Sequence, residues 1–173
     1  TLDRFMRLHP DSPAIDYALY MKGVINFNED LGLFSFLSRQ DLSERDQKAA
    51  KQAFESFDEL VKRFRDSRYT PDARARMRYT VNALAQYEVH VARYYYQRGA
   101  YVAAINRAQQ AIADYRDAPA LEEALYILTR AYDKLGMDQL RDDAERVLTE
   151  NYPNSVYMAR GFKGPDKPWW QLW

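Results

Sequence analysis

The residues of this sequence that could carry acid–base or metal chemistry are few and scattered. Its two histidines, His9 and His90, are far apart in the chain, and Glu88 stands two positions before His90. That spacing directs the two side chains to different faces of a helix. The acidic group at 142–145 has the pattern of a solvated helix face. We therefore expect no metal site, no cofactor and no catalytic residue.

The sequence also lacks the short motifs that position phosphates, zinc or an activated serine. None of G-x-G-x-x-G, G-x-x-x-x-G-K-[ST], H-E-x-x-H or G-x-S-x-G occurs. There is no cysteine, which excludes disulfides, thiolate metal sites and a cysteine nucleophile. We predict a non-enzymatic protein that acts by binding.

Overall charge does not favour a nucleic acid or an anionic membrane as the partner. Lys plus Arg and Asp plus Glu both number 25 in 173 residues, so the formal net charge is zero. The densest basic stretch, 63–78, is interrupted by Asp66 and Asp72, which favours a protein contact or a solvated face over RNA. No apolar run approaches the length of a membrane span. The start, TLDRFMRLHP, has no signal-peptide core, and we expect Thr1 to be an interior residue of a longer protein.

A short phrase recurs four times and divides the chain into helical units. It reads HPDS at 9–12, FRDS at 64–67, YRDA at 115–118 and YPNS at 152–155. Proline, Asp, Asn and Ser at these places end one helix and begin the next. The separations are 55, 51 and 37 residues, against about 34 for a tetratricopeptide unit, so two units must be lengthened.

The residues before each phrase match the second helix of a tetratricopeptide repeat. Ala53, Phe57 and Leu60 precede the second phrase at the same offsets as Ala104, Ala108 and Ala111 precede the third. Small residues let a neighbouring helix approach closely. Earlier in the third unit, the spacing A-x2-Y-x3-G-x-Y is met by Ala92, Tyr95, Gly99 and Tyr101, with Gly99 in a left-handed turn.

The last unit departs from this pattern. Tyr132 and Gly136 keep the Tyr–Gly spacing, but the expected small sites fall on Arg141 and Glu145. We expect the neighbouring residues Ala144, Val147 and Leu148 to supply the buried face instead.

We predict an all-α fold, a tetratricopeptide-repeat solenoid of antiparallel helix pairs with one long helix and an inserted loop. The solenoid should occupy 1–155, as the end of one repeat plus three further repeats, with the insertion near 29–45. A Trp-rich tail should follow at 156–173. The predicted helices are 1–9, 13–28, 46–64, 71–98, 100–115, 119–135 and 138–151.

The insertion and the tail are the two segments outside the repeat. Phe34 and Phe36 belong to an apolar group in the insertion, which either folds back over an end of the solenoid or forms a docking site. Trp169 and Trp170 in the tail leave the same choice open. All four are possible accessory contacts.

Three stretches resemble the BamD family of outer-membrane assembly lipoproteins. They are RFMRLHPDSPAIDYALYMKG at 4–23, AFESFDELVKRFRDSRYTPDA at 53–73 and LAQYEVHVARYYYQRGAYVAAINR at 84–107. The resemblance implies a tetratricopeptide scaffold at the periplasmic face of the outer membrane, within the β-barrel assembly machinery. Its implied partners are the POTRA domain of BamA, BamC, BamE and unfolded outer-membrane proteins. From the resemblance we expect the family's N-terminal lipid anchor and first repeats to lie outside this sequence.

The resemblance also carries over one binding residue. Arg107, in the segment VAAINRA, matches the family arginine that contacts an acidic residue of BamA. A guanidinium beside the small-residue face could form a bidentate charge pair with a partner, or a pair with a carboxylate of its own chain. We further assign Asn106, Tyr95, Tyr132 and Arg4 to the protein-binding surface.

One alternative function remains open on the sequence. A different tetratricopeptide adaptor would bind peptide segments of partner proteins. Such domains usually carry a Lys/Arg/Asn carboxylate clamp in the groove, which the aromatic-rich face here fits poorly.

Overall fold

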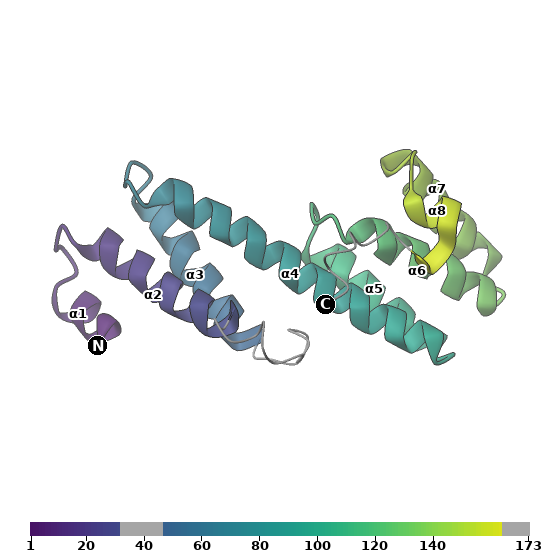
Figure 1. The fold of residues 1–173 in the computed structure, drawn as a ribbon, viewed down its shortest axis with the longest axis horizontal. Coiled ribbons are helices and arrows are strands. Elements are labelled where there is room, and N and C mark those ends of the chain that lie inside the picture. The colour runs from purple at the N-terminus through teal and green to yellow at the C-terminus, as the bar shows by residue number, and fades with distance from the viewer. Residues whose placement is uncertain (32–46, 164–173) are drawn as a thin grey trace. The chain divides into compact units, whose positions relative to one another are not determined.

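The computed structural model describes residues 1–31 and 47–163, and within them the chain is all helical (Figure 1). No strand occurs in these two ranges. The α-helices are α1 (Leu2–Leu8), α2 (Ile15–Leu31), α3 (Gln47–Arg63), α4 (Thr70–Gln97), α5 (Tyr101–Asp114), α6 (Leu121–Lys134), α7 (Asp138–Asn151) and α8 (Val156–Arg160), followed by the 3-10 helix η1 (Gly161–Lys163).

The predicted fold class and helix boundaries are confirmed. Each of the seven predicted helices is present, and its ends fall within three residues of the prediction. The helix α2 continues to Leu31, so the first residues of the expected insertion are helical. The prediction placed no helix after residue 155, whereas the structure has α8 and η1 there.

The chain divides into two compact units. Unit 1 comprises Thr1–Leu84 and unit 2 comprises Ala85–Trp173, so the boundary falls within α4. In unit 1, α2 packs against α3, and α1 packs against α2. In unit 2, α6 packs against both α5 and α7. These antiparallel neighbours are the helix pairs of a tetratricopeptide-type solenoid.

All four boundary phrases fold as the same turn. In each one the backbone N–H of the fourth residue donates to the carbonyl of the first at 3.0–3.1 Å: Ser12 to His9, Ser67 to Phe64, Ala118 to Tyr115 and Ser155 to Tyr152. The first residue also donates to the carbonyl four positions earlier, which closes the preceding helix: His9 to Phe5, Phe64 to Leu60, Tyr115 to Ala111 and Tyr152 to Leu148. The repeated phrase is therefore a repeated hydrogen-bonding unit.

Unit 1 is built around the aromatic ring of Phe57. The predicted buried positions Ala53, Phe57 and Leu60 on α3 have no exposed surface. Phe27 of α2 meets the Phe57 ring edge-on, with centroids 6.3 Å apart. Gly23 of α2 lies directly against that ring, because a Cβ added to it would stand 2.8 Å from the Phe57 Cζ. The glycine is what lets α2 approach α3 so closely.

Unit 2 uses small residues at the corresponding contacts. The predicted positions Ala92, Ala104, Ala108 and Ala111 all have no exposed surface and belong to one core cluster. Gly99, between α4 and α5, has φ +77°, which confirms the predicted left-handed turn.

The last helix pair confirms part of its prediction and corrects the rest. Ala144 and Leu148 of α7 are buried, as expected, and Gly136 before α7 has φ +67°. Val147 is 37% exposed, so that part of the prediction is wrong. The reason is angular: Ala144 and Leu148 are four positions apart and share one helix face, whereas Val147 lies off it.

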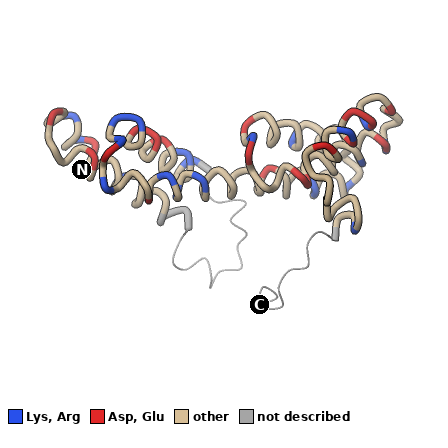
Figure 2. The backbone as a smooth tube through the Cα atoms, turned by 90° about the horizontal axis from the view of Figure 1, so that it is seen from above, with Lys and Arg blue, Asp and Glu red and all other residues tan. Residues whose placement is uncertain are grey.

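Charged residues of both signs are interspersed along each unit, as Figure 2 shows. Many pair within a single helix, such as Lys62 with Asp58 at 2.6 Å on α3 and Arg146 with Asp143 at 2.9 Å on α7. Such exposed pairs contribute little stability. The pairs that join different helices are the informative ones and are described below.

Gly23→Ala should destabilise unit 1. The added methyl group would overlap the fully buried Phe57 ring, and overpacking of this kind costs about 1–3 kcal/mol. Without the clash, Ala in place of a helical Gly would stabilise the protein by about 1 kcal/mol. Urea unfolding of the unsubstituted chain and of the variant measures the change in the free energy of unfolding. A decrease indicates the clash with Phe57, and an increase indicates that there is none.

The same substitution in a Phe57→Leu background is the matched control. The smaller side chain makes room for the methyl group, so the penalty of Gly23→Ala should shrink there. An equal penalty in both backgrounds would show that the ring does not set the helix spacing.

Candidate protein-binding site

Arg107 lies on α5 and already has one partner within its own chain. Its Nη1 donates to the Glu88 Oε2 of α4 at 3.1 Å. The Glu88 side chain is 9% exposed and the Arg107 side chain is 46% exposed. The sequence left open an intramolecular pair or a contact with a partner protein. The structure shows the first, and the exposed edge of the guanidinium keeps further donors for the second.

The other predicted site residues of unit 2 differ in exposure. Asn106 is exposed next to Arg107. Tyr95 of α4 is half-buried and packs against the core of the unit. Tyr132 of α6 is only 6% exposed, and its hydroxyl accepts a hydrogen bond from the Gln109 Nε2 at 3.0 Å. Asn106 and Arg107 are therefore exposed to solvent, whereas Tyr95 and Tyr132 pack within the unit.

Arg107 and Tyr132 also face different ways. Arg107 bonds to α4, whereas Tyr132 bonds to Gln109, two positions further along α5. Residues two apart on a helix point to nearly opposite faces. Arg107 thus lies on the α4 side of α5 and Gln109 on the α6 side, and Asn106, three positions before Gln109, is exposed nearer to the Gln109 side.

The remaining predicted contacts lie elsewhere. Arg4 is exposed on α1, in unit 1. Phe34, Phe36, Trp169 and Trp170 lie outside the described residues.

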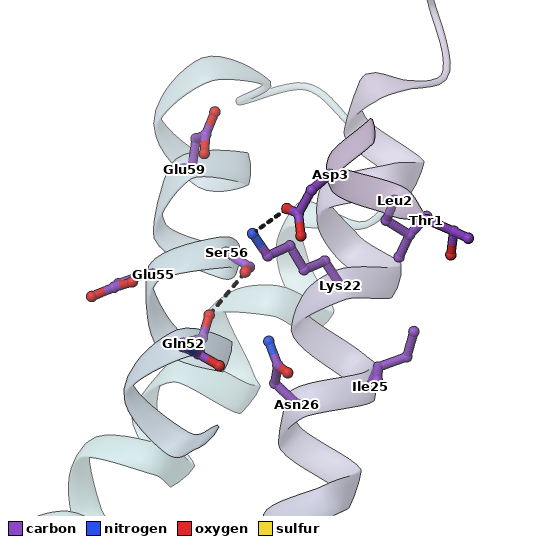
Figure 3. Close-up of a pocket in the computed structure, with 10 residues that line it drawn as sticks. All are labelled: Thr1, Leu2, Asp3, Lys22, Ile25, Asn26, Gln52, Glu55, Ser56 and Glu59. Atoms are coloured by element: carbon purple, nitrogen blue, oxygen red, sulfur yellow. Dashed lines mark hydrogen bonds and ion pairs between the residues drawn. The ribbon is translucent and has the colours of Figure 1, made fainter. Parts of the chain in front are cut away.

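Unit 1 contains a polar groove of about 450 Å³ between α1, α2 and α3 (Figure 3). Lys22 of α2 reaches across to Asp3 of α1, with the Nζ 2.6 Å from the Oδ1. This hydrogen bond from Lys22 holds the pKa of the Asp3 carboxyl below its ordinary value. The full lining is Thr1, Leu2, Asp3, Lys22, Ile25, Asn26, Gln52, Glu55, Ser56 and Glu59.

Unit 2 contains an apolar groove of about 360 Å³ formed by α5, α6 and α7. Tyr132 lies in its lining, and the exposed Val147 and Leu140 of α7 form part of it. The full lining is Gln109, Ile112, Ala113, Leu125, Leu128, Tyr132, Leu140, Asp143, Ala144 and Val147.

A partly buried charge network joins α4, α6 and α8, and the sequence analysis did not predict it. Both the Nε and the Nη2 of Arg93 donate to the carboxylate of Glu123, which is 5% exposed. The Tyr157 hydroxyl donates to the Glu123 Oε2 at 3.0 Å. A bidentate pair satisfies both charges in this partly buried position. The sequence contains only an Arg and a Glu in neighbouring helices as an indication of this ion pair, and such a combination is too common to predict one.

The described residues offer no metal centre. Within 1–31 and 47–163, no three His, Asp or Glu side chains gather so that they could hold an ion. No helix in these ranges is both long and apolar enough to span a membrane.

Comparison with known proteins identifies the family. The family described as YfiO, outer membrane lipoprotein, matches residues 1–148. The chain belongs to this family. The relatives described below are named as assembly factors and not as enzymes, which agrees with the sequence prediction.

Several relatives carry the name outer membrane protein assembly factor BamD. The protein of Neisseria meningitidis serogroup A is 49% identical over 99% of this chain and 64% of its own length. Those of Xylella fastidiosa (strain Temecula1) and Vibrio cholerae are 37% and 34% identical, over 97% and 87% of this chain and 57% and 63% of their own lengths. The chain thus spans less than two thirds of these relatives. Membership of the YfiO family confirms the resemblance and associates the chain with the outer membrane.

Ionisation of Tyr157 should release α8 at high pH. Burial, and then the charge of Glu123, raise the pKa of Tyr157 from 10.0 to about 12. Because the folded pKa is the higher one, the stability that the neutral phenol contributes is complete below pH 10.0 and is lost between 10.0 and about 12. Phenolate absorbance of the chain, minus that of a Tyr157→Phe variant, should show this late titration.

Amide hydrogen exchange in α8, compared between the lower and upper ends of that window, gives the structural readout. A pKa of Tyr157 at the ordinary value of 10.0 would mean that its hydroxyl is not buried against Glu123.

Proposed function

We propose that this chain is a non-enzymatic scaffold of the β-barrel assembly machinery at the periplasmic face of the outer membrane. In this role it docks the POTRA domain of BamA and helps to insert outer-membrane proteins. The observation that carries the proposal is the 49% identity to an outer membrane protein assembly factor, which extends over 99% of the chain. BamC, BamE and unfolded outer-membrane proteins are further proposed partners, and a lipid anchor outside this chain would tether the whole protein.

The surface proposed for BamA is the exposed surface of α5 around Asn106 and Arg107. Arg107 is held at one end by Glu88 and remains 46% exposed, so its orientation is set before a partner arrives. A guanidinium fixed in this way loses less conformational entropy on binding than a free side chain does. An acidic residue of the partner could then accept from the remaining donors.

Rigid helix packing suits this scaffold role. The residues that position α5 are alanines without exposed surface, and packed cores of this density deform little. The scaffold would present its docking side chains in a fixed arrangement and would not reshape itself around each partner.

The alternative proposal is a different tetratricopeptide adaptor that binds peptide segments. The polar groove of unit 1 supports it, because Asn26, Gln52 and Glu55 offer donors and acceptors that an extended polar segment could use. The identity to assembly factors favours the first proposal.

Arg107→Leu should weaken binding of the isolated POTRA domain of BamA by about tenfold, which corresponds to about 1.4 kcal/mol. Arg107→Glu should weaken binding further, because it places a like charge opposite the partner's carboxylate. Titration calorimetry at two salt concentrations measures both effects, and the unsubstituted chain should show the stronger salt dependence.

Two further variants make the result specific. Arg74→Leu removes an exposed arginine from α4 in unit 1 and should leave affinity unchanged. Glu88→Gln keeps the shape of the side chain but removes the charge that fixes Arg107, so affinity should fall, by less than it does with Arg107→Leu. Unchanged affinity with Arg107→Leu would remove Arg107 from the interface, whereas unchanged affinity with Glu88→Gln would show that Glu88 does not position it.

A further inference from the structure

The last described segment of the chain, α8 with η1, covers an aromatic face of unit 2. We define the aromatic face by Tyr96 of α4 and by Glu122, Glu123 and Tyr126 of α6. The Phe162 ring of η1 lies between the two tyrosines, with centroids 4.8 Å from Tyr96 and 5.0 Å from Tyr126. Aromatic pairs at these separations are stabilising beyond the area they bury.

Two adjacent carboxylates of the aromatic face accept hydrogen bonds from α8. The backbone N–H of Val156 donates to the Glu122 Oε1 at 2.9 Å. The hydroxyl of Tyr157 donates to the Glu123 Oε2 at 3.0 Å. Glu122 thus accepts from a backbone N–H and Glu123 accepts from a phenol hydroxyl. A segment that binds this face needs a tyrosine and a backbone N–H that is free to donate.

Gly161 lets the segment make both kinds of contact. Its φ of +66° is strained for other residues, and a Cβ there would lie 3.4 Å from the Tyr126 hydroxyl. The chain turns at this point, so Tyr157 reaches Glu123 while Phe162 reaches Tyr126. The recognition pattern is thus a phenol followed five positions later by a second ring.

The segment is short, and besides these bonds the Tyr157 ring lies near that of Tyr126, with centroids 6.0 Å apart. α8 has five residues, none of them buried, and Met158 in its middle is 44% exposed. A helix this short is unstable by itself. Segments with few buried contacts open at a free-energy cost well below that of global unfolding.

The aromatic face would remain intact when α8 leaves. Arg93 still pairs with both oxygens of Glu123, so no buried charge loses its partner. Tyr96 still packs against the core cluster of unit 2 and near Tyr101, 5.4 Å away between centroids. Because Glu123 keeps its ion pair with Arg93 when α8 leaves, a segment of another protein could take the place of α8 without leaving a buried charge unpaired.

We propose that the aromatic face is a second protein-binding site, which α8 and η1 occupy in cis. Its partner is a short segment of another protein that carries a tyrosine and, five positions later, a second aromatic residue. This site lies apart from Arg107 and does not depend on the docking of BamA. The occupant in cis keeps the site closed until a partner segment competes with it.

The test is an NMR titration of the full 173-residue chain with the peptide SVYMARGFK, which has the sequence of residues 155–163. A Tyr157→Ala/Phe162→Ala variant vacates the face, so it should bind the peptide at least tenfold more tightly than the unsubstituted chain does. The reason is that an occupant in cis acts at an effective concentration of about millimolar. Shifted signals should include Tyr96, Glu122 and Tyr126.

Two controls accompany it. A peptide with both rings replaced by Ala should not bind either chain. Met158→Ala alters an exposed residue of α8 that makes neither contact, so this variant should exclude the peptide as the unsubstituted chain does.

Equal affinity of the double variant and the unsubstituted chain would overturn the proposal. Loss of signal dispersion throughout α6 and α7 in the double variant would overturn it as well, because α8 would then be part of the core. Glu122→Gln keeps both rings, removes the carboxylate that accepts from Val156, and should give intermediate affinity in a chain that remains folded.

Discussion

Close contact between helices through alanine is the constraint on which the rest of unit 2 depends. Ala92 of α4 and Ala104, Ala108 and Ala111 of α5 have no exposed surface. A methyl side chain keeps the two backbones near each other, and any larger group would separate them. Unit 1 reaches the same closeness differently, because Gly23 there accommodates the ring of Phe57. Alanine packed against alanine in unit 2, and glycine packed against a phenylalanine ring in unit 1, both allow two helices to lie close together.

The polar contacts between helices follow from this spacing. Arg107 reaches Glu88, Gln109 reaches Tyr132, and Arg93 reaches Glu123 because α5 and α6 lie close to their neighbours. Each of these pairs satisfies a group that would otherwise be buried without a partner. They also determine which side chains are exposed: Arg107 keeps an exposed edge, whereas the Glu123 carboxylate accepts hydrogen bonds from Arg93 and from Tyr157 of α8. The exposed side chains that remain available for docking are therefore determined by how the helices pack.

Periodicity and the boundary phrases predicted α1 to α7, because the longer helices have buried faces that repeat and because each phrase marks the end of a helix. Periodicity failed at α8, a five-residue helix too short to show a period, although the cap residue was visible: Ser155 in the last phrase accepts from the Met158 N–H. It also failed at Val147, since α7 has only the narrow buried face of Ala144 and Leu148. The pairing of Arg107 with Glu88 joins positions 19 apart on different helices, and no local pattern encodes it. The proposed binding role of Arg107 comes from the family resemblance, because the contacts within the chain do not assign it.

The most direct test of this account enlarges one alanine. Ala108→Leu places three extra carbons where no space remains, so urea unfolding should show a loss of about 1–3 kcal/mol in the free energy of unfolding. Ala113→Leu, an exposed position on the same helix, is the matched control and should change that free energy by less than about 0.5 kcal/mol. If Ala108→Leu costs no more than Ala113→Leu, close alanine packing does not position α5, and the account of unit 2 is wrong.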